Sequence, residues 1–275
     1  MKLSNFLLIF LIFITSTSFG NSIDQSGRGA IYEVIAPGVG SGTGFIVNDS
    51  LLGSVLVTCK HVVQDTTGNY VDSILVRRNK LLPSGQTVSD TTKFVVRLKA
   101  KNGFYLVKHP NPNVDLVMIL ILSGFNTTLP SSESIVGFSS SSVLSKETMS
   151  QIGIKEGTDV ELIGFSLSRS LSPNTIHYHF SRFGKIGLYT PQDLSLVIDK
   201  KLVTANYILL DMVIRPGDSG SPIFARIANR EYLIGFTKGF SPATEYGIGY
   251  PVYYLYDLMK AVKEIFSAVL NQIKK

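Results

Sequence analysis

Short apolar runs separated by polar turns recur along most of the chain and predict β-strands. In the first half such runs lie at residues 51–58 and 93–98, and residues 116–122 form the continuous apolar run of a buried strand. A second series extends from residues 160–165 to residues 250–255. This regular spacing favours an all-β sandwich or barrel over alternating strands and helices.

The end of the chain has a different period. Leu255, Leu258, Val262, Phe266 and Val269 follow one another at steps of three and four, which predicts an amphipathic helix over residues 253–275. The strand pattern is also interrupted at residues 123–150, where Ser, Thr and Pro dominate, as in a linker. We therefore expect β-rich units at 21–122 and 151–252, joined by that linker and followed by the helix.

The first 20 residues have the pattern of a secretory signal peptide. Lys2 gives a basic start, residues 6–14 are unbroken apolar sequence, and small residues lead up to Gly20. The run is short of the roughly 20 apolar residues that span a bilayer. We predict export to the periplasm or the medium, with cleavage after Gly20 or Ser18; an uncleaved membrane anchor is the alternative.

Composition limits the possible partners. The formal charge of +6 is spread over loops, without the Lys/Arg stripe and interleaved aromatics of a nucleic-acid surface, so no nucleic-acid partner is expected. Nothing after the signal segment resembles a membrane span, so no membrane contact is expected after cleavage. The single cysteine, Cys59, excludes an intrachain disulfide. The sequence does not indicate an oligomeric state.

A glycine-rich segment late in the chain has the composition of a nucleophile loop. It reads Gly217-Asp218-Ser219-Gly220 and is followed by an apolar run. Glycines permit unusual backbone conformations and close approach of a substrate, so that successive N–H groups can converge on one point. A β-hairpin turn rich in Gly, Ser and Pro is the alternative interpretation of this segment alone.

Two further residues supply what a serine nucleophile needs. His61 follows the apolar run at 51–58, and Asp115 immediately precedes the buried run at 116–122. A hydroxyl requires a neighbouring base, and the base requires a group that holds its tautomer and stabilises its cation. The order His61, Asp115, Ser219 provides one candidate for each role.

At this point the chain resembles the trypsin/chymotrypsin-fold serine proteases, and among them the bacterial DegP/HtrA-like protease domain. The resemblance covers nearly all of the expected mature chain and rests on five segments in order: Gly42-Thr43-Gly44-Phe45, Thr58-Cys59-Lys60-His61-Val62, Asp115-Leu116-Val117, residues 157–165 and residues 211–222. No residues follow the terminal helix for a PDZ module, so peptide-gated assembly is not expected.

The resemblance implies a fold and a mechanism. The fold would be two antiparallel six-stranded β-barrels with the active site between them, His61 and Asp115 coming from the first and Ser219 from the second. Ser219 would attack a peptide carbonyl while His61 takes its proton, and the backbone N–H groups of Gly217 and Ser219 would form the oxyanion hole. The expected partner is a protein or peptide substrate, and no cofactor is implied.

Specificity is also carried over from the resemblance. The primary pocket would be framed by Val213, Ile214, Arg215, Lys238, Gly239, Phe240 and Gly249. Val213 at its base offers no charge and Phe240 narrows the opening, so we expect small or medium apolar residues at the cleaved position.

Several features leave questions open. No Ile-Val-Gly-Gly activation sequence precedes the first strands, so Asp218 needs a partner other than a freed amino group; Arg28-Gly29 as a processing point is less favoured than an ordinary loop arginine. Cys59 is interpreted as a buried structural thiol. His177 and His179 alternate on one probable strand without a third ligand, so no metal site is predicted. A catalytically silent binding protein on the same fold is the alternative function.

Overall fold

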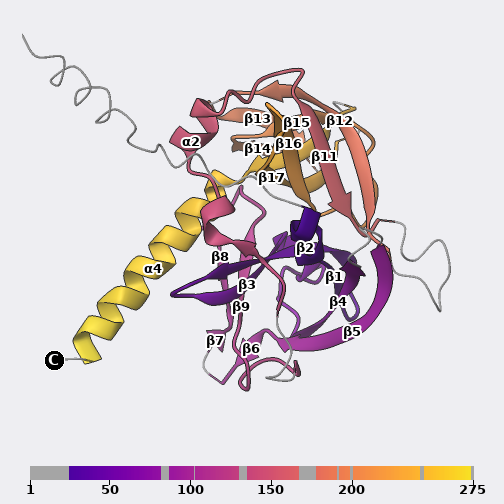
Figure 1. The fold of residues 1–275 in the computed structure, drawn as a ribbon. Coiled ribbons are helices and arrows are strands. Elements are labelled where there is room, and N and C mark those ends of the chain that lie inside the picture. The colour runs from indigo at the N-terminus through magenta and orange to yellow at the C-terminus, as the bar shows by residue number, and fades with distance from the viewer. Residues whose placement is uncertain are drawn as a thin grey trace, which may run out of the picture.

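The computed structural model describes residues 25–81, 87–101, 103–129, 135–166, 178–190, 192–198, 201–241 and 245–273. The predicted signal segment lies outside these ranges. The described chain forms two β-rich halves, with a long C-terminal helix that starts at the second half and runs along the side of the first (Figure 1).

The N-terminal half is a curved sheet of eight strands in the order β5-β4-β1-β2-β3-β9-β8, with β10 paired in parallel to β2. Its strands are β1 (Ile31–Ala36), β2 (Gly40–Asp49), β3 (Gly53–Thr58), β4 (Ser73–Leu81), β5 (Thr87–Arg97), β8 (Leu106–Lys108), β9 (Val117–Ile121) and β10 (Phe138–Ser139). β6 (Lys99–Ala100) and β7 (Gly103–Phe104) form a separate small hairpin. A short 3-10 helix, η1 (Gln25–Ala30), precedes β1.

A closed six-stranded barrel was expected for this half, but the described strands form an open sheet. In the described strands β5 and β8 remain the ends of the sheet, and they do not pair with each other. The segment after β9 reaches β5 instead, because the Thr128 amide donates to the Val95 carbonyl at 3.0 Å and the Arg97 amide donates to the Asn126 carbonyl at 2.7 Å. The buried Asn126 side chain also donates to the Leu120 carbonyl. A turn held by a side-chain amide therefore spans the gap, and an alternating strand pattern does not reveal such a turn.

The C-terminal half is the closed six-stranded antiparallel barrel that the resemblance implied. Its order is β11-β12-β15-β18-β17-β16, and β16 closes it by pairing with β11. The strands are β11 (Asp159–Gly164), β12 (Phe180–Tyr189), β15 (Ile208–Asp211), β16 (Pro222–Ile227), β17 (Arg230–Phe240) and β18 (Gly247–Pro251). A two-stranded hairpin of β13 (Leu194–Ile198) and β14 (Lys201–Ala205) stands apart from it.

The described part of the predicted linker is packed rather than loose. It contains β10, a 3-10 turn η3 (Ser140–Ser142) and helix α2 (Lys146–Gln151). The Phe138 ring contacts Phe45 of the first half at 6.0 Å and Phe224 of the second at 5.8 Å between centroids. One aromatic side chain from the linker therefore joins the cores of both halves.

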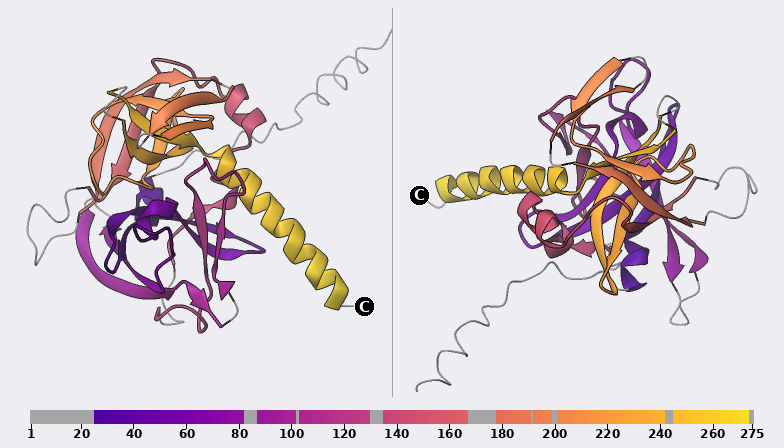
Figure 2. Two further views of the ribbon diagram at one scale, coloured as in Figure 1. Left: turned by 180° about the vertical axis from the view of Figure 1, so that it is seen from behind. Right: turned by 90° about the horizontal axis from the view of Figure 1, so that it is seen from above.

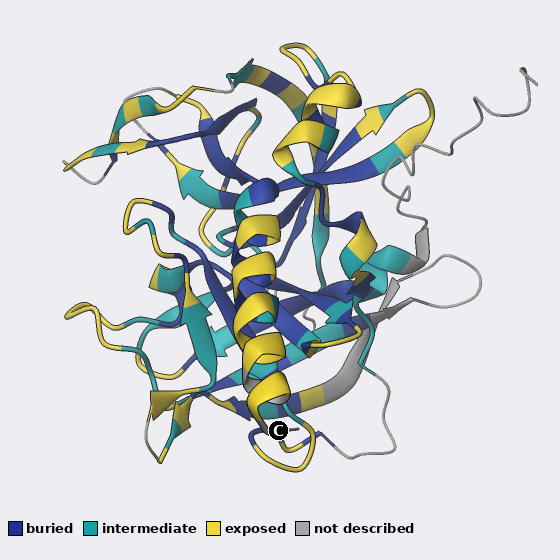
Figure 3. Ribbon diagram, turned by 90° about the vertical axis from the view of Figure 1, so that its left-hand side faces the viewer, coloured by how far each residue is buried: buried dark blue, intermediate teal, exposed yellow. Residues whose placement is uncertain are grey.

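The C-terminal helix, α4 (Tyr253–Ile273), starts immediately after β18. The predicted strand at residues 250–255 is wrong beyond Pro251, because Leu255 is buried as part of the helix. The first turns bury Leu255, Leu258 and Val262, while the later turns project from the body and are largely exposed (Figures 2 and 3). None of the helices in the described ranges is both long and apolar enough to cross a bilayer.

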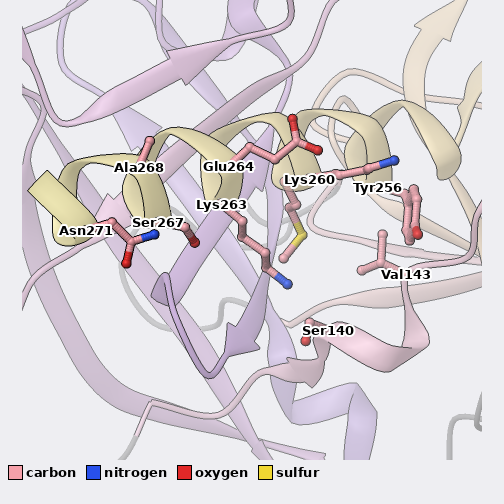
Figure 4. Close-up of a pocket in the computed structure, with 10 residues that line it drawn as sticks. Ser140, Val143, Tyr256, Lys260, Lys263, Glu264, Ser267, Ala268 and Asn271 are labelled. Carbon is pink, nitrogen blue, oxygen red and sulfur yellow. The ribbon is translucent and has the colours of Figure 1, made fainter.

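One ion pair attaches α4 to the first half. Lys263 Nζ lies 2.6 Å from the carboxylate of Asp49, whose side chain is 1% exposed at the end of β2. Lys263 also lines a pocket of about 540 Å³ between α4 and η3, together with Ser140 and Tyr256 (Figure 4). The helix therefore belongs by sequence to the second half but is bound to both.

Candidate active site

The local chain paths of two paired strands bring His61 and Asp115 together. His61 lies in η2 (Lys60–Val62), directly after β3, and Asp115 lies just before β9. β3 pairs with β9 so that Thr58 faces Val117. His61 Nδ1 lies 2.5 Å from Asp115 Oδ2, and the His61 backbone amide donates to Oδ1 at 3.2 Å. The carboxylate therefore holds both the ring and the backbone of His61.

The two members of this pair differ in solvent exposure. The Asp115 side chain is 13% exposed and the His61 side chain 49% exposed. Burial works to raise the pKa of Asp115, but the hydrogen bonds and charge of His61 and the ammonium of Lys238 outweigh it and hold that pKa below its usual value. Asp115 is thus an ionised group behind a histidine that faces solvent.

Ser219 lies in the turn between β15 and β16, whose amides are only partly paired within the described ranges. The amides of Asp218, Gly220 and Ser221 donate to the carbonyls of Arg215, Thr237 and Asp218. Within the described ranges the amides of Gly217 and Ser219 have no hydrogen-bond partner. Gly217 and Gly220 have φ of +96° and +84°, which other residues rarely adopt. The glycines thus permit a turn whose two free donors are those expected for an oxyanion hole.

Thr43 of β2 holds this turn against the first half. Its amide donates to the Ser219 carbonyl at 2.8 Å, and its hydroxyl donates to the Gly217 carbonyl at 2.8 Å. The same hydroxyl accepts from the Phe165 amide at 2.9 Å, just after β11. The sequence identified Thr43 only as part of a motif. A threonine between two glycines was the signal that could have indicated this role.

The Ser219 hydroxyl points to the backbone of β17. Ser219 Oγ donates to the Lys238 carbonyl at 2.9 Å. Across the described ranges, no hydrogen bond joins His61 to Ser219. The acceptor of the serine hydroxyl is therefore the backbone of Lys238, a residue that lines the same cleft as His61 and Asp115.

The partner of Asp218, which the sequence left open, is Arg182 of β12. Arg182 Nη1 lies 3.0 Å from Asp218 Oδ2, and the same oxygen accepts from the Arg215 amide at 2.8 Å. Arg182 also donates to the Ser166 hydroxyl. Burial raises the pKa of Asp218, although the Arg215 amide and Arg182 oppose the rise. An internal arginine thus binds the carboxylate between the two free amides.

Residues 42–235 match the family model of the trypsin-like peptidase domain. The chain belongs to the trypsin-like peptidase family. Its fold is similar to an inactive form of a mutant of Rv3671c from M. tuberculosis H37Rv, with 14% identity, a TM-score of 0.50 and coverage of 86% of this chain and 87% of that one. It is also similar to the HtrA-type protease AlgW with a decapeptide, with 16% identity, a TM-score of 0.52 and coverage of 88% and 68%.

The family match confirms the expected trypsin-like peptidase domain, and the likeness to the HtrA-type protease is one of fold. Comparison with the curated proteins finds no match.

A cleft of about 570 Å³ opens beside the His61–Asp115 pair of this peptidase. Both halves and the β13–β14 hairpin contribute to its walls. Of the residues expected to frame the primary pocket, Lys238 lines this cleft, whereas Val213 is 64% exposed and Ile214 is buried. The expected residue preference at the cleaved position stays a prediction.

The remaining expected pocket residues of the peptidase lie in β17, in β18 and in the turn before β16. Phe240 is 46% exposed at the end of β17, after Gly239, and Arg215 contributes its backbone amide to Asp218. A Cβ at Gly249 would lie 2.5 Å from Ile223 Cδ1, so this position has no room for a side chain. A side chain at 249 would therefore displace the end of the Ile223 side chain inside the barrel.

Three groups in the peptidase could ligate a metal ion. Ligand atoms of Cys59, His61 and Asp115 all lie within 4.8 Å of one another. The Cys59 thiol is fully buried, donates to the Thr237 carbonyl at 3.2 Å, and has a pKa raised by burial. A protonated thiol is a poor ligand, so the geometry favours a structural role for Cys59.

The histidine pair considered as a metal site falls partly outside the described residues. His177 lies outside the described residues, whereas His179 is packed edge-on against Phe165, with ring centroids 5.9 Å apart. Burial and the charge of Arg28 lower the pKa of His179 to about 4. Arg28 itself binds Glu161 with both guanidinium nitrogens at 2.7 and 2.8 Å. Arg28 thus links η1 to β11, and His179 packs beside Phe165, just after β11.

Proposed function

We propose that this peptidase is a serine endopeptidase that uses Ser219 as nucleophile, His61 as general base and Asp115 as the group that orients His61. The observation that carries the proposal is the 2.5 Å contact between His61 Nδ1 and Asp115 Oδ2. It fixes the imidazole so that Nε2 is the nitrogen left for the serine proton. The proposed reaction is hydrolysis of a peptide bond through an acyl-enzyme.

The proposed cycle begins with a change of hydrogen-bond partner. The Ser219 hydroxyl leaves the Lys238 carbonyl and donates to His61 Nε2, a contact that often tightens only when substrate binds. Ser219 Oγ then forms a bond to the peptide carbonyl carbon while its proton passes to His61. The carbonyl oxygen becomes an oxyanion that accepts from the amides of Gly217 and Ser219.

The second half of the cycle returns the proton. His61 donates it to the leaving amine as the peptide C–N bond breaks, which leaves an ester on Ser219. A water then repeats the attack with His61 as base, and the released Ser219 recovers its proton. Asp115 stays ionised throughout, because its lowered pKa opposes protonation.

Labelling with a fluorophosphonate probe tests this assignment. We expect the folded mature protein to be modified at Ser219, as located by mass spectrometry of the peptides. Modification should be lost in Ser219→Ala and His61→Ala and retained in Ser150→Ala, a substitution in helix α2. Labelling of His61→Ala as fast as that of the protein without this substitution would contradict the proposal.

A catalytically silent binding protein is the second candidate function. It is favoured by the hydrogen bond of Ser219 to the Lys238 carbonyl in place of one to His61. This candidate predicts that folded protein resists the probe but still binds peptides.

Primary specificity and export are further parts of the proposal. Cleavage of a peptide library should favour small or medium apolar residues at the cleaved position, and a preference for Lys, Arg or Glu there would overturn this. Mass spectrometry of the protein secreted by expressing cells should give an N-terminus at Asn21 or Phe19. Retention of the intact leader in membranes would support the anchor instead.

A further inference from the structure

The cleft beside the His61–Asp115 pair has an uneven distribution of charge. Among the described residues, four lysines line it and Asp115 is the one acidic lining residue. They come from four separate segments: Lys60 from η2, Lys108 from the end of β8, Lys201 from the start of β14 and Lys238 from β17. Folding therefore brings together, at one site, positive charges that lie far apart in the sequence.

Within the described ranges, Asp115 forms no ion pair with Lys60, Lys108 or Lys201. Both oxygens of Asp115 are bound by His61, through its ring and its amide. The Lys60 ammonium donates to the Pro112 carbonyl at 3.1 Å, which is a neutral acceptor. Lys108 and Lys201 are exposed and, within the described ranges, have neither a hydrogen bond nor an ion pair through their side chains.

The lysines also act on one another. Burial and the nearby charge of Lys108 lower the pKa of Lys60, against the opposing effect of Asp115. An anionic group in the cleft would relieve this repulsion, so the charge here complements a negatively charged ligand.

The position of the cleft connects this charge to the reaction. The backbone carbonyl of Lys238, which lines the cleft, accepts from the Ser219 hydroxyl. A peptide whose scissile bond lies at Ser219 must therefore place side chains from one side of that bond in or near the cleft. The walls include Tyr70, Ile198 and Val203, which suit the apolar parts of a peptide.

We propose that this cleft selects peptide substrates that carry Asp or Glu on one side of the scissile bond, at positions next to the cleaved residue, with Lys108 and Lys201 as the main contacts. The inference rests on the proposed peptidase activity and names the substrate class of the same site. It concerns the neighbouring positions and leaves an apolar residue at the cleaved position.

Cleavage of paired fluorogenic peptides tests the selection. The two peptides share one sequence, except that the positions next to the cleaved residue are Glu in one and Lys in the other. We expect kcat/KM about tenfold higher for the Glu peptide, with an advantage that shrinks as salt rises. In Lys108→Glu/Lys201→Glu the preference should reverse, and in Lys155→Glu, outside the cleft lining, it should remain. Equal rates, or no reversal, would overturn the inference.

Binding to Ser219→Ala separates this inference from the proposed activity. The labelled Glu peptide should bind this variant more tightly than the Lys peptide, and Lys108→Glu/Lys201→Glu should remove the difference. Failure of probe labelling together with this binding pattern would sink the activity and keep the acidic-peptide site. Probe labelling of Ser219 without any charge preference in peptide binding would keep the proposed activity and overturn the acidic-peptide site. Displacement of the Glu peptide by an oligonucleotide of equal charge, as strong as by unlabelled peptide, would show a general polyanion site and also overturn the inference.

Discussion

Arg182 Nη1 lies 3.0 Å from Asp218 Oδ2, and the two side chains are 13% and 1% exposed. Asp218 stands between Gly217 and Ser219, the residues whose amides are unpaired within the described ranges. The ion pair therefore binds the turn to β12 from inside the barrel. It holds the turn through a residue already present in the folded chain, without a freed N-terminal amino group.

Replacing Arg182 by Ala should destabilise the protein and disturb this turn. Removing one partner of a buried ion pair costs about 3–5 kcal/mol, because the other charge remains buried. We also expect kcat to fall about 10–10³-fold as the two amides lose their positions. Chemical denaturation and peptide hydrolysis measure the two effects.

A matched control is Arg226→Ala, which breaks an exposed pair with Glu231 and should change stability little. Arg182→Ala combined with Asp218→Asn should recover part of the stability. Equal costs for the Arg182 and Arg226 substitutions would contradict a structural role for the buried pair.

Thr43→Val should affect both stability and rate, whereas Thr43→Ser should affect neither strongly. Valine keeps the shape of threonine but removes the acceptor of the Phe165 amide and the donor to the Gly217 carbonyl. An unsatisfied buried group costs about 1–3 kcal/mol. Unfolding free energies and kcat of the two variants provide the measurement, and a Val variant as active and stable as the Ser variant would show that the hydroxyl is dispensable.

Asp115→Asn should reduce kcat by about 10⁴ if Asp115 orients His61 in catalysis. The amide cannot stabilise the imidazolium and favours the wrong tautomer of His61. The rate of fluorophosphonate labelling should fall in parallel, while the melting temperature shows whether the fold is kept. Asp72→Asn, at an exposed carboxylate near Lys99, is the control expected to label normally.

The strand pattern of the sequence was sufficient to predict the segments on which the three candidate residues lie. Asp115 could be placed because a continuous apolar run follows it, and that run is β9 in the structure. The turn around Ser219 could be placed because the segment is rich in glycine, and in the structure Gly217 and Gly220 have φ of +96° and +84°. Such signals are local, so they can be recognised in the sequence without knowledge of the tertiary contacts.

Other parts of the site depend on closure of the sheets. Arg182 lies in β12, where burial alternates along the strand, and only the closed barrel brings it to Asp218, 36 residues later. The lysines at 60, 108, 201 and 238 meet only when η2, β8, β14 and β17 surround one cleft. The link from Asn126 to β5 likewise depends on tertiary contacts, because the Asn126 side-chain amide donates to the Arg97 carbonyl 29 residues earlier.

Ser221→Ala should leave stability unchanged or raise it by up to about 1 kcal/mol. Ser221 is fully buried, and its hydroxyl has no partner in the described part of the chain. Deleting an unpaired buried hydroxyl removes a desolvation cost. Thermal unfolding of the variant is the measurement.

Gly164→Ala supplies the complementary test at the same place. A Cβ at Gly164 would overlap Ser221 Oγ and lie 3.0 Å from Asp218 Oδ1, so this substitution alone should cost about 1–3 kcal/mol. In the Ser221→Ala background the cost should be smaller, because one clash is gone. Additive effects of the two substitutions would show that they do not interact.

The attachment of α4 to the first half should depend on pH through Asp49. Burial works to raise the pKa of Asp49, but Lys263 and the amides of Leu51 and Leu52 outweigh it and lower the pKa to about 2, from 3.8. A carboxyl with a depressed folded-state pKa binds fewer protons in the folded state than in the unfolded state. Its contribution to stability is therefore fully present above about 4 and is lost as pH falls towards about 2.

Lys263→Met should consequently lower the free energy of unfolding by about 1–2 kcal/mol at neutral pH, since Lys263 is about a third exposed. The difference from the unmodified protein should shrink as pH falls through the window in which Asp49 is protonated. Urea unfolding at a series of pH values measures it, with Lys155→Met as the control, at an exposed lysine that has no ion pair within the described ranges. A constant difference at every pH would mean that Lys263 stabilises α4 by packing of its aliphatic stem and not through the charge of Asp49.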